Sequence, residues 1–98
     1  MVSPVNITVK PKLHGVKMKR ILRFTASWCQ PCKTMSKLLE EMNTNIPIEV
    51  VDIDVHSEVA MEYGIRSVPT LVLKDSNIEV KRMVGLKSKQ QLAEWLND

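Results

Sequence analysis

Two cysteines, Cys29 and Cys32, have the spacing best suited to chemistry in this chain. Cys29 stands where an apolar stretch ends and a helical pattern begins, and Pro31 would lie in the first turn of that helix. The first N–H groups of a helix lack partners within it and carry partial positive charge, so a thiolate at Cys29 would be stabilised. A thiolate is the attacking species in disulfide exchange, and Cys32 follows one helical turn later, within bridging reach. The pattern favours a redox-active dithiol.

Two other interpretations of the pair compete with this one. Cysteines often serve as small buried apolar residues, but here both cysteines of the chain fall at one helix start. A zinc site could combine the pair with His14 and His56, but structural zinc sites use four ligands with recognisable paired spacing, and these histidines are far apart. A C-x-x-C motif among alternating strands and helices is more typical of redox chemistry than of either alternative.

Apolar spacing and turn residues predict the elements that position the pair. Strands are predicted over 21–26, 46–53, 69–74 and 78–84, with a further strand over 5–9 and a connection over 10–18. Helices are predicted from the dithiol onward, between an N-cap at Ser57 and a closing Gly64, and after Ser88. A tight turn at 75–77 joins the last two strands. Because strands alternate with helices before this hairpin, the order predicts an α/β fold with a parallel core and an antiparallel edge.

Length and composition predict one domain over residues 1–98. Of these 98 residues, 44% are hydrophobic and 26% charged, as in ordinary globular domains. The net charge of +3 is mild and only 4% of residues are aromatic, which argues against a nucleic-acid-binding surface. The sequence shows neither a secretory signal pattern nor an apolar stretch long enough to span a membrane. We therefore expect a cytoplasmic protein that binds neither nucleic acid nor membranes.

Three separated segments resemble the thioredoxin family. Residues 28–33, Trp-Cys-Gln-Pro-Cys-Lys, are similar to its Trp-Cys-Gly-Pro-Cys-Lys signature, with Gln30 in place of glycine. Residues 63–71, Tyr-Gly-Ile-Arg-Ser-Val-Pro-Thr-Leu, resemble its second signature, in which a cis-proline lies beside the dithiol; Gly85 matches a glycine that lets the substrate backbone approach. The resemblance implies a thioredoxin fold, with a central mixed β-sheet flanked by helices and the N-terminal helix short or missing.

The resemblance also implies a mechanism. Cys29, as the exposed thiol, would attack a disulfide of a client protein, and Cys32 would resolve the mixed disulfide, leaving a Cys29–Cys32 bridge. A reductase partner, typically thioredoxin reductase, would re-reduce the bridge, so that no metal or other cofactor is needed and the protein is expected to act as a monomer. The residues implied to form a shallow substrate groove are Trp28, Gln30, Pro31, Val68, Pro69 and Gly85.

One position departs from the family pattern behind the dithiol. The family usually has a buried aspartate six residues before the first cysteine, and here that residue is Arg23; the lysine that commonly accompanies it is matched by Val50. Burying an unpaired arginine is costly, so Arg23 should either reach solvent or pair with a carboxylate. We expect Arg23, together with Lys33, to lower the pKa of the thiols rather than to accept a proton.

Two other functions stay open beside a protein-disulfide reductase. One is a glutaredoxin-like reductase that uses glutathione, although Trp28 and the Pro-Cys-Lys ending argue against it. The other is a non-catalytic binding subunit that uses the same groove without redox turnover. Turnover with glutathione alone, compared with turnover with a thioredoxin reductase, distinguishes the glutaredoxin-like reductase from the leading hypothesis. Cys32→Ser distinguishes the binding subunit, because a subunit that only binds should keep its function.

Overall fold

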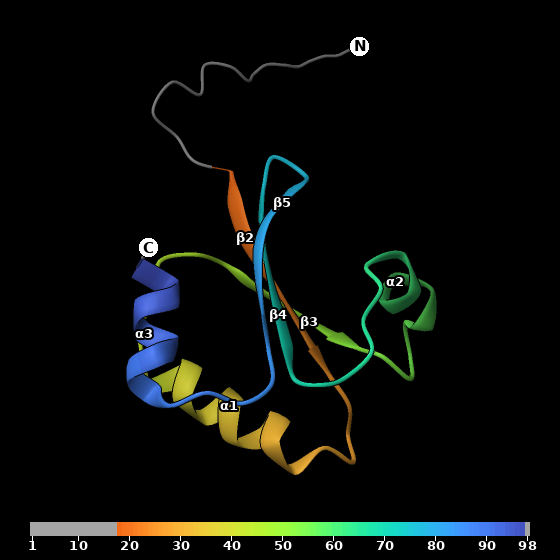
Figure 1. The fold of residues 1–98 in the computed structure, drawn as a ribbon, viewed down its shortest axis with the longest axis horizontal. Helices are drawn as coiled ribbons and strands as arrows, with labels where there is room; N and C mark the ends of the chain where they lie inside the picture. Colours follow the sequence, from red (N-terminus) through yellow and green to blue (C-terminus); the bar gives the residue numbers. More distant parts are fainter. Residues whose placement is uncertain (1–17, 98) are drawn as a thin grey trace.

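The computed structural model describes residues 18–97. Its elements are β2 (Lys19–Thr25), α1 (Gln30–Glu41), β3 (Ile48–Asp52), α2 (Ser57–Glu62), β4 (Thr70–Asp75), β5 (Ile78–Val84) and α3 (Lys89–Asn97) (Figure 1). This order agrees with the order predicted from the sequence over the same part of the chain. The strand predicted over 5–9, most of the connection after it and the shortened N-terminal helix lie outside the described residues.

The four strands form one mixed sheet in the order β3-β2-β4-β5. β2 and β3 are parallel, whereas β4 is antiparallel to both β2 and β5. In Figure 1, α1 and α3 lie together on one side of the sheet, while α2 lies apart from them. The predicted fold class, a central mixed sheet flanked by helices, is therefore confirmed.

The two faces of the sheet bury different side chains of β2, because successive residues of a strand point to opposite faces. Ile21 packs in a cluster with residues of α1 and α3, whereas Leu22 and Phe24 pack in a second cluster with residues of α2. Phe24 is fully buried, and its ring lies 5.7 Å from that of Tyr63. β2 is thus a central strand that packs against both helix layers and leads to Cys29.

Most predicted strand ends differ from the structure by one or two residues: β2 begins at Lys19 and ends at Thr25, and β4 runs one residue later than predicted. Two other ends have a clear backbone cause. The strand predicted over 46–53 is shorter, starting at Ile48, because Pro47 has no N–H for the ladder, although its carbonyl accepts from Ile21 N–H at 2.9 Å. Ser57 is the first residue of α2 rather than its N-cap. The N-cap is His56, whose N–H donates to the Asp52 carbonyl at 2.8 Å and so closes the preceding turn.

Local turn chemistry agrees with the prediction at three other ends. Gly64 follows α2 with φ 64°, a left-handed conformation that glycine adopts at low cost. Ser76 and Asn77, between β4 and β5, also have positive φ, as a tight hairpin requires. Ser88 caps α3, since its hydroxyl accepts from the Gln91 N–H at 3.1 Å and its own N–H donates to the Gln91 side chain.

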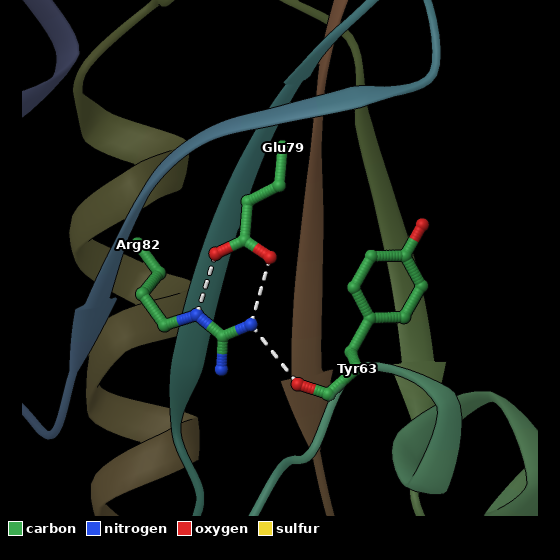
Figure 2. Close-up of polar contacts among 3 residues, drawn as sticks. All are labelled: Tyr63, Glu79 and Arg82. Atoms are coloured by element: carbon green, nitrogen blue, oxygen red, sulfur yellow. Dashed lines mark hydrogen bonds and ion pairs between the residues drawn. The ribbon is translucent and has the colours of Figure 1, made fainter.

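Arg82 of β5 links the sheet edge to the end of α2 (Figure 2). Its guanidinium donates to both carboxylate oxygens of Glu79, at 2.6 and 2.8 Å, and to the carbonyl of Tyr63 at 2.9 Å. Tyr63 is the C-cap of α2 and begins the loop that runs to Pro69. The pair therefore holds the start of that loop against β5.

Replacement of Glu79 by glutamine should lower stability in a pH-dependent way. Hydrogen bonding by Arg82 holds the pKa of Glu79 below its ordinary value of 4.5. A depressed folded-state pKa stabilises the fold above the unfolded value, and the gain is lost as pH falls through the folded pKa. Since the pair is partly exposed, we expect E79Q to cost about 0.5–1 kcal/mol near neutral pH and progressively less as the pH falls through the lowered pKa of Glu79.

Urea unfolding of E79Q and wild type across this pH range measures the effect. Glu62→Gln on α2 removes the same charge at an exposed position and is the control. A difference between E79Q and wild type that does not change with pH would contradict the assigned ion pair.

No helix of residues 18–97 is both long and apolar enough to cross a membrane.

Candidate functional site

The two cysteines lie at the junction between β2 and α1 and are joined by a disulfide. Cys29 is the N-cap of α1, with extended backbone angles, and its sulfur accepts a hydrogen bond from the Cys32 N–H at 3.1 Å. The helix start therefore places a backbone donor on the Cys29 sulfur, where it would stabilise a thiolate. The Cα atoms of the pair lie 5.3 Å apart, within the range of protein disulfides.

Both cysteines are almost enclosed in this oxidised state. Cys29 is 4% exposed and Cys32 is 1% exposed, so the expectation of an exposed Cys29 is wrong for the bridged form. They form a small apolar cluster with Ala26, against which Ile53 and Val68 pack. The sequence could not reveal this enclosure, because the packing residues come from separate loops.

The loop before β4 covers the disulfide from one side. The Val68 carbonyl oxygen lies 3.8 Å from the Cys29 sulfur, and the Val68–Pro69 peptide bond is cis. Pro69 is fully buried, and its carbonyl accepts from the Gly85 N–H at 2.8 Å. Gly85 has φ 87°, so its left-handed backbone suits glycine. The structure therefore brings together all three segments that resemble the family.

Trp28 forms an exposed apolar surface next to the disulfide. Its side chain is 67% exposed, and its indole N–H donates to the Asp54 carboxylate at 2.9 Å. Asp54 is itself fixed, because its N–H donates to the Asp52 side chain at 2.8 Å. From the sequence alone, neither Asp52 nor Asp54 was singled out. The pattern that could have indicated them is two aspartates at the carboxyl end of β3, the strand that pairs with β2.

Gln30, Pro31 and Lys33 are exposed at the first turn of α1. Gln30 and Pro31 lie between the cysteines in the sequence and are exposed, as Trp28 is. Lys33 directly follows Cys32 and lines a hollow behind the pair. Among residues 18–97, no group of three or more His, Cys, Asp or Glu residues could hold a metal ion, and His14 lies outside that range.

Arg23 lies on the face of β2 that carries α1, in register with Val50 of β3. Its side chain is neither free in solvent nor fully buried, and it lines two adjoining hollows, one beside Cys32 and one beside Glu40. Burial lowers the pKa of Arg23, and the charge of Glu40 partly offsets this. We expected Arg23 either to reach solvent or to pair with a carboxylate. In the structure it is partly exposed, and the Glu40 carboxylate lies near it.

A mixed sheet with a disulfide at the amino end of its first described helix defines a thiol–disulfide redox protein. The bridge is the redox centre, because it lies where a thiolate would be stabilised and beside a loop that lines the sulfur.

Comparisons with known proteins agree with this class. The family model described as Thioredoxin matches residues 7–98. The chain is 43% identical over 79 residues to thioredoxin of Bacillus subtilis, covering 76% of this chain and 75% of that protein. It is 40% identical over 80 residues to thioredoxin of Chlamydia caviae, covering 79% and 78%. The chain belongs to the thioredoxin family, and it is a thiol–disulfide oxidoreductase with protein-disulfide reductase activity.

Solved structures show the same fold. A mutant thioredoxin from Halobacterium salinarum superposes with a TM-score of 0.76 at 29% identity, covering 87% of this chain and 77% of that chain.

Proposed function

We propose that this protein is a general dithiol donor for protein disulfides, in which Cys29 attacks and Cys32 resolves. The observation that carries the proposal is the difference between the two sulfurs: Cys29 receives the Cys32 N–H and lies against the Val68 carbonyl, while Cys32 is 1% exposed. The N–H at the start of α1 would stabilise a thiolate at Cys29, the form that attacks a client disulfide. Attack by Cys29 and resolution by Cys32 therefore follow from which sulfur receives the donor at the helix start.

The groove that we propose for the client chain surrounds Cys29. Trp28 supplies an exposed apolar wall, Gln30 and Pro31 border it on α1, and Gly85 lies beneath the Pro69 carbonyl. The Val68 backbone lies at the end of the sheet, where an extended client chain could pair with it as an added strand. Such pairing recognises the backbone rather than particular side chains, which suits varied clients.

The electrons would come from a reductase partner and not from a bound cofactor. We propose thioredoxin reductase as that partner, a cytoplasmic setting and a monomeric donor, because the family resemblance covers the dithiol and both neighbouring segments. The glutathione system is the alternative electron source.

Insulin reduction tests the proposed function. Reduced protein should cleave insulin disulfides catalytically, and NADPH with a thioredoxin reductase should sustain turnover better than glutathione alone. Turnover that needs glutathione and ignores the reductase would assign the alternative electron source. Absence of turnover with either donor would overturn the reductase role in favour of a binding subunit.

Arg23 provides a separate test of thiol electrostatics. Replacement by aspartate reverses a charge in the hollow that Cys32 lines, so we expect R23D to raise the pKa of the Cys32 thiol. Titration by thiolate absorbance in a Cys29→Ser background isolates Cys32 from its partner. Arg20→Asp makes the same charge change at a half-exposed position near the start of β2, outside the hollow, and is the control. An unchanged Cys32 pKa in R23D would exclude an electrostatic role for Arg23.

A further inference from the structure

A hollow of about 210 Å³ adjoins Cys32, and none of the residues proposed for the client groove lines it. It forms where the ends of β2 and β3 meet the first two turns of α1. The residues that line it are Arg23, Thr25, Ala26, Ser27, Cys32, Lys33, Ser36 and Asp52. Because one water occupies about 30 Å³ of liquid, the hollow has room for several waters.

Asp52 is the only carboxylate among the described residues that line this hollow. It is the last residue of β3 and pairs in register with Thr25, so the parallel ladder brings it beside the strand that leads to Cys29. Its Oδ1 accepts from the N–H groups of Asp54 and Val55, at 2.8 and 3.3 Å. These two bonds hold the carboxylate through its Oδ1 atom. The other oxygen, Oδ2, takes no part in them.

Cys32 needs a route for its proton during resolution. It is 1% exposed even without a client, and a client joined to Cys29 would cover the groove side further. A thiol is a poor nucleophile until it loses its proton. The hollow beside Cys32 offers both space for water and the fixed carboxylate of Asp52.

We propose that Asp52 accepts the proton of the Cys32 thiol through water in this hollow while the mixed disulfide is resolved. The proposal rests on the proposed roles of the two cysteines. The Cys32 thiolate then attacks the Cys29 sulfur, the Cys29–Cys32 bond forms, and the bond between Cys29 and the client sulfur breaks. The client sulfur leaves as a thiolate and takes up a proton, so the client disulfide gains two electrons and the dithiol loses two.

The charges around the hollow determine in which direction the rate of resolution changes when Asp52 is replaced. Arg23 on β2 and Lys33 on α1 line the hollow as cations, and Glu40 lies in the adjoining hollow near Arg23. A purely Coulombic role for Asp52 would disfavour the Cys32 thiolate, so removing its charge would speed resolution. A proton acceptor acts in the opposite direction, because removing it slows resolution.

Asp52→Asn tests the proposal, because an amide oxygen can still accept from the Asp54 and Val55 N–H groups but cannot take up a proton. Reduced protein is mixed with dithiobis(nitrobenzoic acid), and the two releases of nitrothiobenzoate are followed in rapid mixing. The first release reports attack by one thiol, and the second reports resolution by the other. Glu49→Gln, on the same strand and exposed, is the matched control. Asp52→Ser, which can also cap the turn, is a second variant should D52N fold poorly.

We expect D52N to slow the second release by roughly tenfold to a hundredfold near neutral pH and to leave the first release within about twofold. The deficit should disappear at alkaline pH, where hydroxide deprotonates Cys32 directly. A second release as fast as in E49Q, a faster one, or equal slowing of both releases would overturn the proposal. No protein client is used, so failure of Asp52 here is distinct from failure of the insulin assay.

Discussion

Replacement of Cys32 by serine is expected to abolish turnover with disulfide substrates while leaving the first exchange reaction in place. Cys29 keeps its position at the N-cap of α1 and the N–H donor of residue 32, so its thiolate stays stabilised. The hydroxyl that replaces the resolving thiol cannot displace the client sulfur. C32S should therefore accumulate a covalent complex and lose turnover by roughly a thousandfold or more when no other thiol is supplied.

Mass spectrometry of C32S after mixing with a disulfide substrate measures this outcome. The expected mass is that of the protein plus one substrate sulfur moiety, and reduction should restore the original mass. Cys29→Ser is the matched comparison and should form no complex, because it removes the sulfur that receives the N–H at the helix start. A stable complex on Cys32 in C29S, or turnover by C32S near the wild-type rate, would contradict the assigned roles. Such turnover would also show that one cysteine suffices, as in a glutathione-dependent reaction.

Replacement of Phe24 by alanine is expected to cause a large loss of stability. Phe24 is fully buried in the central strand, packs with Tyr63 at 5.7 Å and belongs to the cluster that joins the sheet to α2. Removal of a buried phenylalanine side chain leaves a cavity and typically costs ~3–5 kcal/mol. Because domains of this kind are stable by only ~5–15 kcal/mol, the variant should lose a large share of its stability.

Denaturant unfolding of the oxidised protein, with the disulfide intact in both forms, gives the measurement. Met61→Ala on α2 removes an 80%-exposed apolar side chain and should change stability by less than about 0.5 kcal/mol. A cost below ~1 kcal/mol for F24A would contradict its place in the core. Disulfide exchange by F24A should persist under conditions where the variant is folded, since Phe24 packs in a different cluster from the two cysteines.

The dithiol and its setting could be predicted from the sequence because each signal is local. The apolar run into Cys29, Pro31 in the first turn and the spacing of Cys32 lie within one short segment and specify a helix that begins at the pair. Periodicity likewise predicted the order of the described strands and helices. The exceptions were element ends such as Ile48 and His56, where the backbone hydrogen bonds of neighbouring segments decide the boundary.

The surroundings of the dithiol depended on the tertiary structure. The enclosure of Cys29 arises from Val68, and the support of Trp28 arises from Asp54, residues far along the chain that the sheet brings together. Asp52 reaches the hollow behind Cys32 because the register of two parallel strands places it beside Thr25. No local pattern reports such a register. The chain by itself therefore determined which two atoms exchange electrons, and the tertiary structure determined which groups surround them.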